Sequence, residues 1–264
     1  MTDVAHWNEC LSVCEQAARA GGAVLLDWMG RFSVREKGPA DLVTEADEAS
    51  QKTIQGIVLG AFPDHAFLAE EGKRTETASE SGYRWIVDPL DGTTNYVHGL
   101  PHFAVSIGLE YRGELVVGVV FDPLANDCFS AAKGQGAFLN GQCLQVSAAT
   151  QASEALVAVG LPTQVRGDSR EIATMVALMT RSRAIRRMGS TALNLSYVAA
   201  GRLDGCWCTG AKSWDVAAGV LLVREAGGQV TAADGNTLDI DRPNFLAAAT
   251  PGLHAELLLV LRNA

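Results

Sequence analysis

The stretch Trp85-Ile-Val-Asp-Pro-Leu-Asp-Gly-Thr-Thr-Asn95 joins an apolar run to two aspartates, a glycine and two hydroxyl residues. Residues 83–87 are rich in aromatic and β-branched side chains and are bounded by polar residues, which predicts a buried strand. Asp88 is then expected at the carboxyl end of that strand. Because Pro89 fixes φ and cannot extend a hydrogen-bond ladder, we expect the chain to turn there and bring Asp91 back beside Asp88.

This pair of aspartates has the character of a site for a hard divalent cation. Such ions take oxygen ligands and rarely more than one or two carboxylates each, which leaves room for water and a substrate phosphate. Two aspartates at the mouth of a strand can share a metal pair, and the carbonyl of Leu90 is free to act as a further ligand. Asp-Pro and Asp-Gly pairs are also ordinary turn formers, and for an isolated pair that interpretation would be favoured.

The residues that follow are suited to phosphate. Gly92 permits close backbone approach, and if Thr93 and Thr94 begin a helix, the free N–H groups there form a phosphate cradle. The Thr93 hydroxyl is also placed to orient a metal-bound water. The stretch as a whole therefore predicts a metal-assisted phosphatase.

Residues 88–95 resemble the signature of the inositol monophosphatase family, which comprises Mg²⁺-dependent, lithium-sensitive phosphatases. Other segments fit the family in chain order: Asp41-Leu-Val-Thr-Glu-Ala-Asp47, Glu70-Glu71, Gly189-Ser-Thr-Ala192, and Trp214-Asp-Val-Ala-Ala-Gly219 leading to Glu225-Ala-Gly-Gly228. The resemblance covers nearly the whole chain. It implies an α/β (α+β) fold, a layered α-β-α-β-α sandwich like that of fructose-1,6-bisphosphatase, and a homodimer.

The resemblance also assigns metal ligands outside the motif. It makes Glu70 a ligand and makes Asp215 the residue that completes a second metal site from the C-terminal half. Glu70, Asp88 and the Leu90 carbonyl would hold one Mg²⁺, and Asp88, Asp91 and Asp215 a second, with two or three ions in each active site. Paired metals about 3.5–4 Å apart lower the pKa of an attacking water and stabilise both oxygens of an in-line displacement.

Each of these residues also has a plainer interpretation. Asp47 lies three residues after Thr44, the spacing of a capping box, while the resemblance pairs Asp47 with Thr93 in polarising the water; both roles are compatible. Asp215 near a helix N-terminus is stabilised by the helix dipole. Acidic pairs such as Glu70-Glu71 are usually just solvated. Whether Asp47 with Thr93, or Glu70 itself, acts as the base is left open.

The substrate is where the match to the family weakens. Gly189, Ser190 and Thr191 fall where the family contacts ring hydroxyls, and Asp91 can accept from a hydroxyl near the phosphate. However, inositol-processing members usually place a glutamate seven residues before the metal aspartate, and this chain has Cys208 there. A thiol cannot replace a carboxylate that accepts two hydrogen bonds.

Three functions therefore stay open. The first is hydrolysis of inositol 1-phosphate or a similar polyol phosphate. The second is hydrolysis of histidinol phosphate, a sugar bisphosphate or a nucleotide 3′-phosphate. The third is a regulatory, protein-binding module that retains the fold, which the intact set of acidic residues disfavours.

Composition limits the class of protein. With 264 residues, 48% of them hydrophobic and 19% charged, the chain can bury a substantial core in one or two domains. The formal net charge of −9 disfavours nonspecific nucleic-acid binding. No apolar run is long enough to span a bilayer and no secretory leader is evident, which predicts a cytoplasmic protein with no membrane partner.

The pattern of apolar residues predicts two halves, 1–146 and 147–264. The first half, with most of the metal ligands, reads as α+β with an antiparallel sheet: helices over 7–28 and after Thr44, strands over 67–69, 103–111 and 114–121, and a hairpin at Asn140-Gly141. The second half, with Asp215 and the substrate contacts, reads as α/β. Its predicted strands are 155–159, 184–188, 205–207 and 245–249, and its predicted helices are 168–180, 191–200, 215–226 and 253–262.

Overall fold

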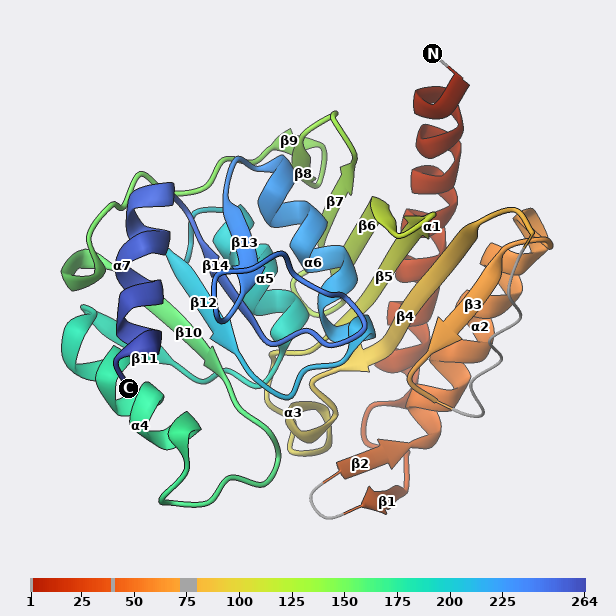
Figure 1. Cartoon of the computed structure of the whole chain (residues 1–264). Helices are drawn as coiled ribbons and strands as arrows, with labels where there is room; N and C mark the ends of the chain where they lie inside the picture. The colour runs from red at the N-terminus through yellow and green to blue at the C-terminus, as the bar shows by residue number, and fades with distance from the viewer. Residues whose placement is uncertain (1, 39–40, 72–79) are drawn as a thin grey trace.

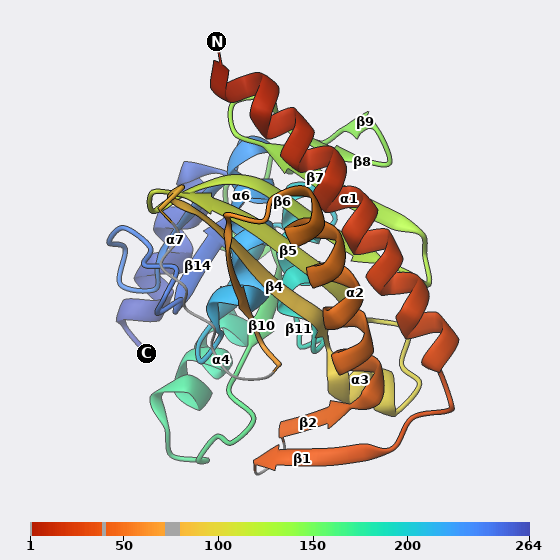
Figure 2. The same cartoon turned by 90° about the vertical axis from the view of Figure 1, so that its right-hand side faces the viewer.

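The computed structural model describes residues 2–38, 41–71 and 80–264. They form stacked layers in the order helices, sheet, helices, sheet, helices (Figure 1). Helices α1 (Thr2–Trp28) and α2 (Glu45–Ala61) form the first layer, and Figure 2 shows both in front of the large sheet. This order confirms the predicted α-β-α-β-α sandwich.

The large sheet is antiparallel except at one edge, where β3 and β4 run parallel. Its strands, in spatial order, are β3 (Ala66–Ala69), β4 (Tyr83–Asp91), β5 (Ala104–Tyr111), β6 (Glu114–Asp122), β7 (Asp127–Ala132), β8 (Ala137–Leu139) and β9 (Gln142–Cys143). The turns at Arg112-Gly113 and Asn140-Gly141 have positive φ at both residues, the conformation of a tight two-residue hairpin. The predicted hairpins are therefore confirmed.

The smaller sheet mixes parallel and antiparallel pairs. Its strands, in spatial order, are β11 (Ala184–Arg186), β10 (Leu156–Gly160), β12 (Gly205–Cys208), β14 (Phe245–Ala248) and β13 (Gln229–Ala232). Helices α5 (Thr191–Ala199) and α6 (Ser213–Glu225) lie between the sheets, and α4 (Arg170–Arg181) and α7 (Pro251–Arg262) cover the outer face. The remaining elements are α3 (Thr93–Val97), the short helix η1 (Ala152–Glu154) and a hairpin of β1 (Val34–Gly38) and β2 (Asp41–Thr44).

Four of these strands were not predicted: β1, β2, β7 and β13. Their sequences explain why. Strand β1 reads Val-Arg-Glu-Lys-Gly and β7 reads Asp-Cys-Phe-Ser-Ala-Ala, so neither shows the β-branched run typical of a strand. Strand β13 buries only Val230, which leaves little apolar signal. These strands form because neighbouring strands pair with them.

The prediction that β4 ends at Asp88 was wrong. Asp88 pairs with Ser106 and Asp91 pairs with Ala104, so the ladder resumes after an irregularity with one extra residue on β4. Pro89 lies in that bulge, where the absence of its N–H breaks no ladder bond. Because side chains alternate along a strand, the extra residue turns Asp88 and Asp91 to the same side, whereas a regular strand would point them apart.

Helix α6 is held close to the large sheet by two glycines. Gly108 of β5 and Gly118 of β6 are directly opposite each other. A Cβ at Gly108 would lie 2.8 Å from the Cβ of Ala217, and one at Gly118 would lie 2.8 Å from the carbonyl oxygen of Ala218. Because neither glycine has a side chain, the helix that carries Asp215 can approach β5, the strand next to β4.

One apolar core joins the two predicted halves. Ile86 and Val120 of the large sheet belong to the same cluster of buried residues as Leu195 of α5 and Val220 of α6. The division at residue 146 stays a prediction. Among the helices of the described residues, none is both long and apolar enough to cross a bilayer.

Candidate active site

The β4 bulge forms the centre of the site. Asp88 is 2% exposed, and its Oδ1 accepts a hydrogen bond from the backbone N–H of Leu90 at 2.9 Å. This bond closes a turn around Pro89 and presents the Leu90 carbonyl to the Thr93 hydroxyl, which donates to it at 3.1 Å. Leu90 is therefore at the predicted place, next to both aspartates.

Helix α3 begins with Thr93, as predicted. Its N-cap is Gly92, with φ of 101°, and a Cβ there would lie 3.0 Å from the carbonyl oxygen of His102. Only glycine suits this conformation and this space. The first N–H groups of the short helix, at Thr93 and Thr94, therefore lie two and three residues after Asp91.

Asp47, in the first turn of α2, also contacts Thr93. Its Oδ1 is 3.3 Å from the Thr93 hydroxyl, and its Oδ2 accepts from the N–H and the hydroxyl of Thr44 at 2.9 and 2.6 Å. The capping box at the start of α2 and the contact with Thr93 are thus both present. Burial raises the pKa of Asp47 to about 6.

Asp91 ties β4 to the C-terminal half. Its Oδ2 accepts from the Ser190 hydroxyl at 2.5 Å and from the N–H of Ala192 at 2.7 Å, both at the start of α5. Ser190 also caps that helix through the N–H of Leu193. The Ser190 hydroxyl is therefore engaged with Asp91, and Thr191 is the first residue of the helix.

Asp215 reaches the same place from α6. Carboxylate oxygens of Asp88, Asp91 and Asp215 all lie within 4.8 Å of one another, and we call these three residues the acid cluster. Asp215 also makes a local hydrogen bond: its Oδ2 accepts from the N–H of Lys212 at 2.8 Å, as expected near a helix N-terminus. The helix-start role and the cluster are compatible.

Glu70 follows β3, with its N–H bonded to the carbonyl of Val87 at 3.2 Å. Its carboxylate is not part of the acid cluster as defined by the 4.8 Å spacing. Its charge nevertheless contributes to the raised pKa values of Asp47, Asp88, Asp91 and Asp215. Glu70 is thus close to the cluster, and residues 72–79 beyond it lie outside the described part of the chain.

Burial and repulsion between carboxylates shape the electrostatics of the acid cluster. Burial, followed by the charge of Asp91, raises the pKa of Asp215 to about 8, and burial raises the pKa of Asp91 to about 6. The pKa of Asp88 is raised well above its ordinary value for the same reason. No described Lys, Arg or His forms an ion pair with any of the three. Two buried carboxylates and one half-buried carboxylate, with no cationic side chain paired to them among the described residues, fit a divalent metal bound through oxygen.

A pocket of ≈ 360 Å³ opens beside Asp215 and is lined by all the predicted substrate contacts except Asp91. We call it the cleft pocket. Cys208 forms part of its wall and packs so closely on Gly160 that a Cβ there would lie 2.4 Å from the sulfur. Burial, followed by the charge of Asp215, raises the pKa of Cys208 to about 12, so the thiol is neutral. Gly189, Ser190, Thr191 and Cys208 thus line one pocket, and their contact with a substrate stays a prediction.

Two asparagines of the site were missed from the sequence. Asn95 donates from Nδ2 to the carbonyls of His102 and Met188, both at 2.7 Å, and a Cβ at Gly189 would lie 2.9 Å from that nitrogen. Asn194 lines the cleft pocket, is 2% exposed, and its Oδ1 has no hydrogen-bond partner among the described residues. Asn95 lies within the opening motif, which was a signal for it. Asn194 belongs to the site only because α5, which carries it, is held beside Asp91 through Ser190.

The model of the inositol monophosphatase family matches residues 6–264. The chain belongs to the inositol monophosphatase family. It is thus a phosphoric monoester hydrolase, which confirms the resemblance and the enzyme class predicted from the sequence.

Individual relatives agree with the family. An inositol-1-monophosphatase of Rhizobium meliloti (strain 1021) is 44% identical over 229 residues, 85% of this chain and 86% of the relative. A protein of Pseudomonas aeruginosa named Nus factor SuhB is 40% identical over 257 residues, 95% of each chain. The crystal structure of the extragenic suppressor protein suhB from Bartonella henselae has a TM-score of 0.92 at 40% identity, covering 97% of this chain and 99% of that one.

Proposed function

We propose that this chain hydrolyses a small phosphate monoester in a Mg²⁺-dependent reaction, with inositol 1-phosphate or a similar polyol phosphate as the first candidate substrate. The observation that carries the proposal is the acid cluster at the edge of the cleft pocket. Carboxylate oxygens suit hard ions such as Mg²⁺, and a phosphate beside them can be held by the first N–H groups of α3.

The proposed ligands are Glu70, Asp88, the Leu90 carbonyl, Asp91 and Asp215, with two or three Mg²⁺ ions in each site. Bound Mg²⁺ lowers the pKa of the attacking water and neutralises charge that develops on the phosphate oxygens. The protein contributes rigidity: the Asp88 bond to Leu90 N–H and the Asp91 bonds to α5 hold the carboxylates before any ligand arrives.

Thr93 and Asp47 are proposed to orient the attacking water and to take its proton. The Thr93 hydroxyl can donate either to the Leu90 carbonyl or to Asp47. When it donates to Asp47, the lone pairs of the Thr93 oxygen are free to accept a hydrogen bond from the water. The pKa of Asp47, raised to about 6 by burial, suits a proton acceptor near neutral pH. Glu70 is the alternative base.

Replacing Thr93 with valine is expected to lower kcat by about a hundredfold and leave KM nearly unchanged, because the hydroxyl positions the water rather than the substrate. Steady-state phosphate release measures both constants. Thr53→Val is the matched control, since the Thr53 hydroxyl bonds only to the Ala49 carbonyl within α2. A large rise in KM with kcat preserved would assign Thr93 to substrate binding instead.

The cleft pocket bears on substrate choice. Its wall offers the neutral thiol of Cys208 and the amide of Asn194, and neither matches the carboxylate that inositol-processing relatives place there. Histidinol phosphate, a sugar bisphosphate and a nucleotide 3′-phosphate are therefore the alternative substrates within the same reaction.

Phosphate release with and without Mg²⁺ tests the proposal. The panel is myo-inositol 1-phosphate, histidinol phosphate, fructose 1,6-bisphosphate, adenosine 3′,5′-bisphosphate and NADP. We expect Mg²⁺-dependent, lithium-inhibited turnover of at least one of these compounds, with myo-inositol 1-phosphate first. Turnover of none would overturn the proposal and favour the regulatory alternative suggested by the name of the Pseudomonas relative.

The proposal includes two properties that follow from the sequence and its resemblance. A homodimer is expected from the resemblance, and a cytoplasmic location is proposed with it. Neither nucleic acid nor membrane is proposed as a partner, because the net charge of −9 repels both phosphate backbones and anionic lipid.

A further inference from the structure

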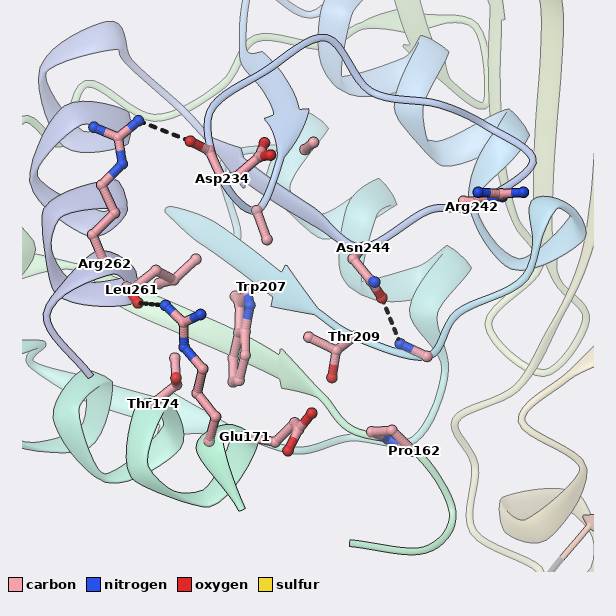
Figure 3. Close-up of a pocket in the computed structure, with 14 residues that line it drawn as sticks. Pro162, Glu171, Thr174, Trp207, Thr209, Asp234, Arg242, Asn244, Leu261 and Arg262 are labelled. Atoms are coloured by element: carbon pink, nitrogen blue, oxygen red, sulfur yellow. Dashed lines mark hydrogen bonds between the residues drawn. The ribbon is translucent and has the colours of Figure 1, made fainter.

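A second and larger pocket lies on the other side of β12 from the cleft pocket. Its volume is ≈ 670 Å³, within the range of small-molecule sites, and no member of the acid cluster lines it. Figure 3 shows Arg262 and Arg242 on opposite sides of this pocket, with Trp207 and Thr209 between them. We call it the arginine pocket.

Three arginines line the arginine pocket: Arg170, Arg242 and Arg262. Two of them are held by backbone carbonyls, since Arg170 donates to Leu261 at 3.2 Å and Arg262 donates to Asp234 at 2.8 Å. Each bond uses one of five guanidinium N–H donors, so the others stay available in a fixed place. These bonds explain the positions of two arginines structurally.

Arg242 has no such structural explanation. Its guanidinium forms no hydrogen bond or ion pair with any residue in the described part of the chain, although the chain carries 30 acidic residues against 21 basic ones. It is exposed at the rim of the pocket, opposite Arg262 (Figure 3). A cation left without a protein partner at the mouth of a pocket is suited to an anionic ligand.

The two carboxylates in the pocket are engaged locally. Asp234 accepts from the N–H and the side-chain amide of Asn236 at 2.9 and 2.8 Å, which lowers its pKa. A hydrogen bond from Ser169 lowers the pKa of Glu171 in the first turn of α4. The charges of Arg262 and Arg170 also lower the pKa of Asp234 and of Glu171, respectively. With three guanidinium groups and two carboxylates, the lining is still positive in a chain whose net charge is −9.

The remaining lining is partly apolar. Trp207, Leu261 and Pro162 contribute ring and aliphatic surface, and the Thr209 Oγ1 is buried with no hydrogen-bond partner among the described residues. Such a lining matches a ligand that carries an anionic group on a ring or chain with apolar surface. Pro162 and Thr209 also line the cleft pocket, so the two pockets adjoin.

We propose that the arginine pocket binds a small organic anion, a phosphate or carboxylate carried on a partly apolar ring or chain, next to the acid cluster but separate from it. The ligand's anionic group lies at Arg242, on one side of the pocket, and its ring extends toward Trp207. The inference does not depend on the proposed hydrolysis, because it involves none of the proposed metal ligands.

Calorimetric titration of protein that has been stripped of metal with EDTA and then dialysed free of EDTA isolates this pocket, since without metal the acid cluster repels anions. The probe is adenosine 5′-monophosphate, and adenosine is the uncharged comparison. We expect saturable binding of the monophosphate that weakens with salt, and adenosine to bind at least about tenfold more weakly, as loss of charge-assisted hydrogen bonds requires.

Variants locate the binding. Arg242→Gln is expected to weaken binding of the monophosphate by about tenfold, because it removes one charged donor. Arg183→Gln makes the same change at an exposed position outside the pocket and is expected to leave binding unchanged. Asp215→Asn is expected to retain binding. Thermal unfolding of each variant confirms that it is folded.

Three results would each overturn the inference: no saturable binding of the monophosphate, equal affinity of the Arg242 and Arg183 variants, or binding lost in Asp215→Asn and retained in Arg242→Gln. The last would place the anion at the acid cluster. Because no turnover is measured, failure here is distinguishable from failure of the proposed hydrolysis.

Discussion

Asp88→Asn is expected to lower Mg²⁺-dependent phosphate release by at least about a thousandfold, or about 4 kcal/mol of transition-state stabilisation. Asp88 is proposed to bridge both metal positions, so a single amide replaces a ligand of each. The fold should be retained, since an asparagine Oδ1 can still accept from the N–H of Leu90. Phosphate release with saturating Mg²⁺ measures the effect, and circular dichroism checks the fold.

The chain contains its own matched control. Asp122-Pro123-Leu124 repeats the tripeptide of residues 88–90, and Asp122 is also buried, with its Oδ1 accepting from Leu124 N–H at 2.9 Å. Asp122→Asn should therefore make the same local change without touching the acid cluster, and activity should be kept. A folded, fully active Asp88→Asn variant would refute the metal assignment.

The metal-free protein is expected to lose stability as the pH rises from about 6.5 to about 8, and Mg²⁺ is expected to restore it. The pKa of Asp215, about 8 in the folded chain, is far above its ordinary value of 3.8, so the folded chain holds a proton that the unfolded chain has released. The free energy of unfolding then falls by about 1.4 kcal/mol per pH unit for that one proton.

The pH window is set by groups that act in the opposite sense. Burial lowers the pKa of His65, His102 and His254 below 6.5, so these residues stabilise the protein above that pH and cost stability below it. As the pH rises above 6.5 the histidines become neutral in the unfolded state as well, so toward pH 8 the carboxyl effect is seen alone. Urea unfolding in EDTA, repeated with Mg²⁺, measures the slope.

Asp215→Asn separates the acid cluster from the rest of the protein in the same experiment. In EDTA near pH 8 the variant should be more stable than the parent, because a buried charge and its repulsion of Asp91 are gone. It should also gain less from Mg²⁺. Asp27→Asn, at a side chain that is 74% exposed, is the control and should change neither property. Equal Mg²⁺ stabilisation of all three proteins would place the metal elsewhere.

Much of the site could be predicted from short stretches of sequence. The capping box at Thr44 and Asp47 depends on neighbouring residues and was confirmed, and α3 begins at Thr93, as the phosphate-cradle hypothesis required. The strands β1, β7 and β13 could not be predicted in this way, because pairing with other strands stabilises them more than their own composition does.

The sequence by itself determined the family and its oxygen donor set, and it pointed to the turn that we propose binds phosphate. The tertiary structure decided how those groups are brought together in space. The extra residue in β4 turns Asp88 and Asp91 to one side, and facing Gly108 and Gly118 let α6 bring Asp215 to them. Sheet register and helix docking depend on contacts far apart in the chain, so no local pattern specifies them. The same long-range packing places Arg242 at the rim of the arginine pocket, with no hydrogen-bond or ion-pair partner among the residues that the structure describes.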